Sequence, residues 1–62
     1  MIYEVFEDRN MAHHWRVEWT DTENEGLCYM ASFAGPGARE MAIEYAEWKA
    51  SKDHAGLVRM AP

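Results

Sequence analysis

The stretch that decides the fold is His14-Trp15-Arg16-Val17-Glu18-Trp19-Thr20. Its large apolar side chains recur at every second residue, and the residues between them are polar or charged. Successive side chains of a β-strand point to opposite faces of the sheet, so this alternation indicates a strand with one buried face and one face in water. We therefore expect residues 14–20 to form the middle strand of a sheet.

Two further strands are expected, one on each side of this stretch. Residues 2–7 alternate in the same way and end at the turn sequence Asp8-Arg9-Asn10. Residues 27–34 follow a polar loop that ends in Gly26, and their odd-numbered side chains share one face. Because short polar connections join the three segments, the sequence predicts antiparallel neighbours in a meander.

A helix is expected after the sheet. Gly35-Pro36-Gly37 ends the third strand, and proline suits the first turn of a helix because its missing N–H would have no partner there. From residue 38 to residue 51 the apolar side chains have helical spacing. The predicted fold class is therefore α+β, a two-layer domain in which a three-stranded antiparallel meander is followed by one C-terminal amphipathic helix (β-β-β-α).

The facing apolar surfaces of sheet and helix predict a single core. On the sheet side it would hold alternate residues of the second and third strands: Trp15, Val17, Trp19, Tyr29 and Phe33. On the helix side it would hold residues three or four positions apart: Met41, Tyr45 and Trp48. Because each large aromatic side chain buries a large apolar area, these residues allow so short a chain to bury enough apolar surface to fold.

The segment 52–62 has two interpretations. Asp53-His54-Ala55-Gly56 is typical of a helix stop, and Leu57-Val58-Arg59-Met60 fits either a short fourth strand or part of a flexible tail. With 62 residues and neither a linker nor a repeat, the whole chain 1–62 is expected to be one small domain.

Charge and cysteine content limit the classes of partner. Eleven Asp and Glu against six Lys and Arg give a formal charge of −5. A field of this sign repels phosphate backbones and anionic lipid headgroups, so nucleic acid and membranes are disfavoured. The single cysteine, Cys28, rules out an internal disulfide, and neither a targeting segment nor a membrane span is visible. A cytoplasmic protein is expected.

The residues do not predict an enzyme, a cofactor or a metal site. Cys28 lies inside an apolar strand, whereas catalytic thiols usually lie at helix N-termini or sharp turns. His13, His14 and His54 lack the spacing of zinc ligands, and adjacent histidines on a strand point to opposite faces. No pair of carboxylates stands out for acid and base catalysis.

Two surfaces remain as candidate binding sites. The sheet face opposite the helix would carry a mixture of apolar and charged side chains, with an interface at Ile2, Phe6, Arg16, Glu18 and Met30. Such a mixture suits contact with a protein, most simply a second copy of the chain. The turn before the helix offers free backbone N–H groups to an anion, with Gly35, Gly37 and Arg39 as the candidate residues.

The two candidate surfaces suggest two functions of different classes. The first is a small non-enzymatic interaction or regulatory protein that acts through its sheet surface or edge strands, as a homodimer or with another protein. The alternative is a small-molecule or anion binder that uses the turn Gly35-Pro36-Gly37. Over about residues 2–50, the order of elements and the glycine before the helix resemble the layout of small HicB-type antitoxin domains, which neutralise a partner toxin. Element order by itself does not imply a function.

Overall fold

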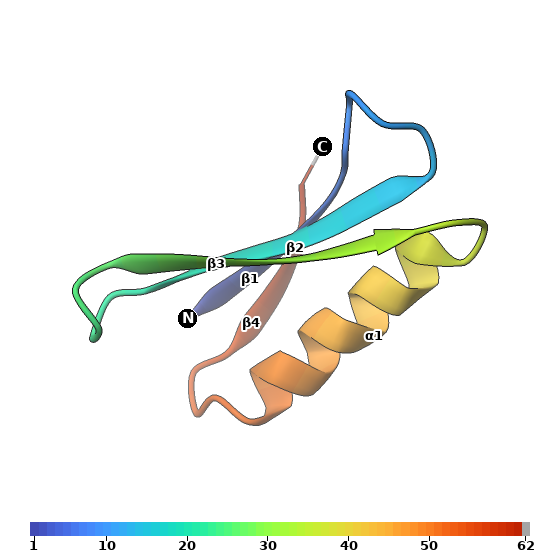
Figure 1. Cartoon of the computed structure of the whole chain (residues 1–62). Coiled ribbons are helices and arrows are strands. Elements are labelled where there is room, and N and C mark those ends of the chain that lie inside the picture. Colours follow the sequence, from blue (N-terminus) through green and yellow to red (C-terminus); the bar gives the residue numbers. More distant parts are fainter. Residues whose placement is uncertain (62) are drawn as a thin grey trace.

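The computed structural model describes residues 1–61. In chain order these form β1 (Ile2–Glu7), β2 (His14–Asp21), β3 (Leu27–Ala34), α1 (Ala38–Ser51) and β4 (Leu57–Met60). The strands make one sheet in the order β3-β2-β1-β4, and α1 packs on one face of it (Figure 1). The predicted α+β fold is confirmed, and of the two interpretations of the segment after the helix the structure shows the short fourth strand. Pro62, the last residue of the predicted tail 52–62, lies outside the described residues.

The register of the sheet puts β2 in the middle of the meander, as predicted. β2 is antiparallel to both neighbours, with Val17 opposite Val5 on one side and Ala31 on the other. β4 is parallel to β1, with Val58 opposite Tyr3. A parallel pair needs a crossover connection, and α1 supplies it by carrying the chain from the β3 edge to the opposite edge, where β4 pairs with β1.

The centre of the core lies between β1, β2 and α1. The buried side chains of the sheet are Tyr3, Val5 and Val17, and those of the helix are Ala38, Ala42 and Ala46. The three alanines are four residues apart, so they form one line along the helix and let its backbone approach the sheet closely. Larger side chains surround this centre, among them Trp15, Trp19, Phe33 and Tyr45.

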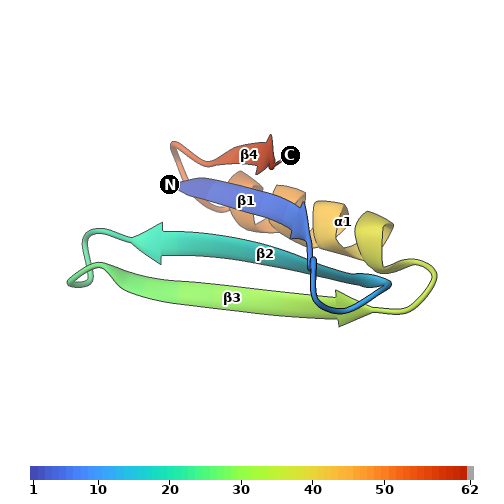
Figure 2. The same cartoon turned by 90° about the horizontal axis from the view of Figure 1, so that it is seen from above.

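The predicted core was wrong at three positions. Met41, Trp48 and Tyr29 are 43%, 53% and 39% exposed. The reason is the position of the helix, which packs mainly on β1 and β2 and covers β3 only in part (Figure 2). Met41 and Trp48 share the β3 side of the helix with Tyr45, so they lie over the uncovered edge rather than over the centre.

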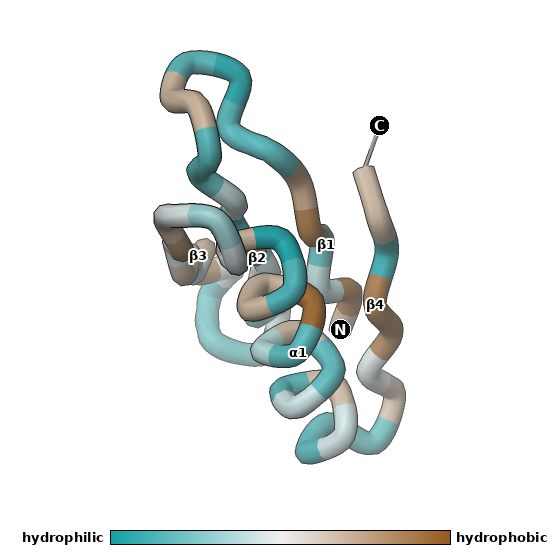
Figure 3. The backbone as a smooth tube through the Cα atoms, turned by 90° about the vertical axis from the view of Figure 1, so that its right-hand side faces the viewer, coloured by the Kyte–Doolittle hydropathy of each residue, from teal (hydrophilic) through white to brown (hydrophobic). Residues whose placement is uncertain are grey.

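The turn from α1 into β4 depends on Gly56. A Cβ atom at this position would lie 2.5 Å from the carbonyl oxygen of Ala50, so no larger residue fits without a shift of the backbone. The close turn brings β4 back along β1, where apolar stretches of the two strands lie side by side (Figure 3). In residues 1–61, no helix is long and apolar enough to cross a membrane.

Candidate functional site

The face of the sheet opposite α1, which we call the open face, has no helix or strand of the described chain over it (Figure 1). It is formed by the even-numbered residues of β1, β2 and β3 together with Leu57 and Arg59 of β4. Three of its apolar side chains are well exposed: Ile2 at 44%, Met30 at 56% and Leu57 at 63%. The open face is therefore more apolar than a surface that only meets water needs to be.

Arg16 lies on the open face in β2, between β1 and β3. Its guanidinium carbon is 5.0 Å from the centroid of the Phe6 ring, and its Nη1 donates to the sulfur of Met30 at 3.5 Å. Its Nε lies 4.0 Å from a carboxylate oxygen of Asp8, without a hydrogen-bond partner among the described residues. Arg16 thus connects two other predicted interface residues, Phe6 of β1 and Met30 of β3.

The other two predicted interface residues lie on the same face, nearer the start of β1. Glu18 is directly opposite Glu4 in the register, and Ile2 is opposite Leu57. Glu4 forms an ion pair with Arg59 at 3.1 Å. The structure therefore places all five residues on one face, with Phe6, Arg16 and Met30 in contact and Ile2 and Glu18 beside them.

A groove of about 690 Å³ runs from the open face over the start of β1 towards the loops. Ile2, Cys28 and Met30 contribute apolar surface to it. The carboxylates of Glu18, Asp21 and Glu23 also line it, and within residues 1–61 none of these three forms an ion pair. The groove consequently combines apolar surface with negative charge that the chain itself does not neutralise.

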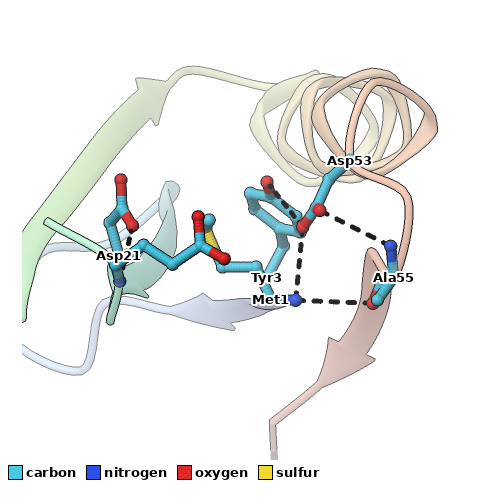
Figure 4. A network of polar contacts seen from close by, with 6 residues as sticks. Met1, Tyr3, Asp21, Asp53 and Ala55 are labelled. Atoms are coloured by element: carbon cyan, nitrogen blue, oxygen red, sulfur yellow. Dashed lines mark hydrogen bonds and ion pairs between the residues drawn. The ribbon is translucent and has the colours of Figure 1, made fainter.

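One end of the groove is fixed by a polar network around Asp53 (Figure 4). Its carboxylate lies 3.2 Å from the N-terminal ammonium of Met1 and accepts a hydrogen bond from the Tyr3 hydroxyl at 3.5 Å. The Ala55 N–H also donates to it, at 3.5 Å. Asp53 appeared in the sequence only as part of a helix stop, and no local spacing links it to residues fifty positions away.

The network shifts two pKa values in opposite directions. The hydrogen bond from the N-terminal ammonium, with smaller contributions from Ala55 and Tyr3, lowers the pKa of Asp53 below its ordinary value of 3.8. Burial, reinforced by the negative charge of Asp53, raises the pKa of Tyr3 above its ordinary value of 10.0. At neutral pH the pair is therefore held as carboxylate and neutral phenol.

The structure brings together only part of the predicted anion site. Gly35 has a φ of 101°, a conformation that favours glycine, and its carbonyl accepts a hydrogen bond from the Ala38 N–H at 3.1 Å. The helix begins after Gly37 without a side-chain cap. Arg39 turns instead towards Trp15, with its guanidinium carbon 5.7 Å from the ring centroid. The cation assigned to the anion site thus stacks on an aromatic ring.

The thiol and the histidines are dispersed. Cys28 is exposed on the open face, with its sulfur 3.5 Å from the Thr20 hydroxyl. His13 has a φ of 60° in the loop before β2, and His14 Nδ1 lies 2.9 Å from the Ala12 carbonyl oxygen. Across residues 1–61, no three His, Cys, Asp or Glu side chains are grouped as metal ligands would be.

Sequence reasoning missed a second surface, at the outer edge of β3. We call it the edge patch, and it consists of exposed apolar side chains of β3 and α1: Leu27, Tyr29, Met41 and Trp48. Tyr29 stacks on Trp19 with ring centroids 5.7 Å apart, and Trp48 contacts Tyr45 at 6.0 Å. Three of these residues, Tyr29, Met41 and Trp48, were predicted to lie in the core, because their spacing shows which side of an element they share but not how far the helix reaches across the sheet.

No family model matches the chain, and no curated protein or solved structure is significantly similar to it. The open face and the edge patch are therefore the features of the molecule that point to a function. The open face holds the residues that the sequence indicated, and the edge patch holds those that only the structure reveals.

Proposed function

We propose that this protein is a non-enzymatic interaction or regulatory domain that binds another protein through its open face. The observation that supports the proposal most is the exposure of Ile2, Met30 and Leu57 on a face that no other element of the described chain covers. Apolar side chains gathered on one face, with charged residues among them, are typical of a protein-binding surface.

The charge of the groove suggests the chemistry of the partner. Glu18, Asp21 and Glu23 lie beside apolar surface without a cation of their own, and the chain as a whole carries −5. Such a surface attracts a partner that presents Lys or Arg among apolar side chains, and it repels acidic partners. The proposed partner is therefore a protein with a basic, partly apolar binding segment.

Peptide selection tests this proposal without knowledge of the natural partner. A library of random peptides displayed on phage would be panned against the immobilised full chain. We expect enrichment of peptides in which Lys or Arg alternate with apolar residues, and weaker binding as salt concentration rises. Enrichment of acidic peptides, or of none, would contradict the proposal.

A matched pair of variants locates the binding surface. Glu18→Lys reverses a charge on the open face, whereas Glu47→Lys makes the same change at an exposed position of α1. Selected peptides should bind the Glu18→Lys variant about tenfold or more weakly and the Glu47→Lys variant about as well as the parent chain. An equal loss of peptide affinity in both variants would show that only the net charge of the chain matters and would contradict binding at the open face.

The alternative function, anion binding at Gly35-Pro36-Gly37, stays a prediction. The lack of a side-chain cap at Gly37 favours it, and the position of Arg39 on Trp15 weakens it. A ligand that binds only the folded state raises the melting temperature, so a shift with inorganic phosphate at constant ionic strength would support an anion site. The absence of a shift across a panel of phosphate compounds would leave the interaction domain alone.

A further inference from the structure

We propose that two copies of this chain pair through their β3 strands, antiparallel and across a two-fold axis at Met30, to form one continuous sheet. Figure 2 shows why β3 is the strand concerned, since it forms an outer edge of the sheet and α1 covers it only in part. The pairing goes beyond the proposed function and does not depend on it. It would join two open faces into one larger surface.

The backbone of β3 is hydrogen-bonded to the sheet on one side only. The Gly35 N–H donates to the His13 carbonyl at 3.0 Å. Bonded and non-bonded positions alternate in an antiparallel pair, so within β3 the odd-numbered residues bond to β2. The N–H and C=O groups of Cys28, Met30 and Ser32 therefore point away from the sheet. An edge of this kind is a template for another strand.

β3 lacks the features that protect such edges in monomeric proteins. Its eight residues, Leu27–Ala34, include no charged residue, proline or glycine. The opposite edge, β4, is four residues long and carries Arg59. Short and charged edges discourage pairing, so β3 is the edge that needs a partner. Pairing of β3 with β4 of the next copy would grow into an open fibre, whereas pairing of β3 with β3 closes after two copies.

The sheet faces restrict the register of this pairing. Directly opposed residues must lie on the same face, and with Met30 at the axis the outward groups of Cys28 in one copy meet those of Ser32 in the other. This register gives about six backbone hydrogen bonds between the copies. It also places the two edge patches against each other on the α1 side, with Tyr29 opposite Ala31 of the second copy.

Charge complementarity favours a second copy over an unrelated strand. In this register Leu27 lies opposite Phe33 of the second copy, so the β2–β3 loop extends towards the start of the second copy's helix. The loop carries Glu23 and Glu25, and α1 begins after Gly37 without a side-chain cap. The N-terminus of a helix carries a partial positive charge, so the acidic loop and the helix start attract each other.

Sedimentation equilibrium of the full chain over low to high micromolar concentration tests the assembly. We expect a mass that rises to twice 7.2 kDa and no larger species. Ser32→Pro removes an outward N–H of β3 without removing a bond to β2, and it should weaken the dimer about tenfold or more. Met60→Pro, the matched change at the β4 edge, should leave the dimer intact.

A cross-link tests the register and does not depend on the proline variant folding. In a Cys28→Ser background, Met30→Cys should form a disulfide-linked dimer under mild oxidation, because opposed residues at the axis lie within disulfide range. The matched variant Thr20→Cys, on the same face but on β2, should not. A chain that stays monomeric at high micromolar concentration would overturn the proposal. So would a dimer that Met60→Pro abolishes and Ser32→Pro does not.

Discussion

The two edge strands of this sheet, β4 and β3, differ in how far they are protected from pairing with another chain. β4 is short, carries a charged residue and lies along β1, with its position set by the turn at Gly56. β3 is twice as long, uncharged and only partly covered by the helix. One helix of fourteen residues covers this sheet of four strands only in part, so the long β3 edge keeps exposed apolar side chains.

The largest expected effect separates the core from the edge patch. Trp19 contacts Tyr3, Tyr29 and Tyr45, with ring centroids 5.5, 5.7 and 6.0 Å away. Trp19→Ala should lower the free energy of unfolding by about 3–5 kcal/mol. Trp48 is 53% exposed, so Trp48→Ala should cost about 1 kcal/mol or less in the monomer. Urea unfolding at low protein concentration measures both, and equal losses would contradict the assignment of Trp48 to the surface.

The next effect concerns the turn that positions the β4 edge. Gly56→Ala places a methyl group against the Ala50 carbonyl and should lower the free energy of unfolding by about 1–3 kcal/mol. A Cβ at Gly37 meets no atom within 4 Å, so Gly37→Ala should change stability by about 0.5 kcal/mol or less. Thermal unfolding of the two variants decides the matter. A neutral Gly56→Ala would show that β4 does not need the close turn.

A smaller effect is expected from pH, because Asp53 ties the start of β1 to the turn before β4. Its pKa is lower in the folded than in the unfolded chain, so its contribution to stability is complete above about pH 3.8 and is lost as the pH falls through the folded pKa. The pKa of Tyr3 is raised, so its contribution is present below about pH 10 and is lost at higher pH.

Variants at these two positions test the direction of both shifts. Asp53→Asn should lower the melting temperature at pH 7 and flatten its decline in acid, whereas Glu47→Gln on the exposed side of α1 should leave the acid limb unchanged. Tyr3→Phe should flatten the alkaline limb. If the melting temperature falls in acid by the same amount in the parent and Asp53→Asn chains, the Asp53 network does not contribute to stability.

The smallest effect is expected at the β4 edge itself. The ion pair of Arg59 with Glu4 is 3.1 Å long, but the two side chains are 59% and 40% exposed. Solvent screens such a pair, so Arg59→Ala should cost less than about 1 kcal/mol. If the charge also guards the edge, Arg59→Val should increase association of the Ser32→Pro variant, as measured by light scattering. Unchanged association would show that the shortness of β4 is protection enough.

Most of the fold was predictable because the signals are local. The alternation through Trp15, Val17 and Trp19 and the helical spacing after Gly37 each report a single element and the side that faces the core. The five interface residues followed from the same alternation, and the structure puts them on one face. Whether they bind a partner stays a prediction.

What sequence reasoning missed depends on contacts between distant residues. The place of β4 beside β1, the network of Asp53 with Met1 and Tyr3, and the exposure of Trp48 follow from how the helix crosses the sheet. Periodicity gives the direction of a side chain and not its depth. For the same reason, it could not separate the edge patch from the core.

The most direct test of the central claim, that β3 is the edge through which the chain associates, is amide hydrogen exchange measured by NMR at several protein concentrations. If two copies pair through β3, exchange at Cys28, Met30 and Ser32 slows as concentration rises. The Leu57 N–H donates to the Met1 carbonyl and the Ala61 N–H to the Val5 carbonyl, so the N–H groups of residues 58 and 60 face outward and should exchange quickly throughout. Exchange at the three β3 amides that does not change with concentration, or slowing at residues 58 and 60 instead, would contradict the claim.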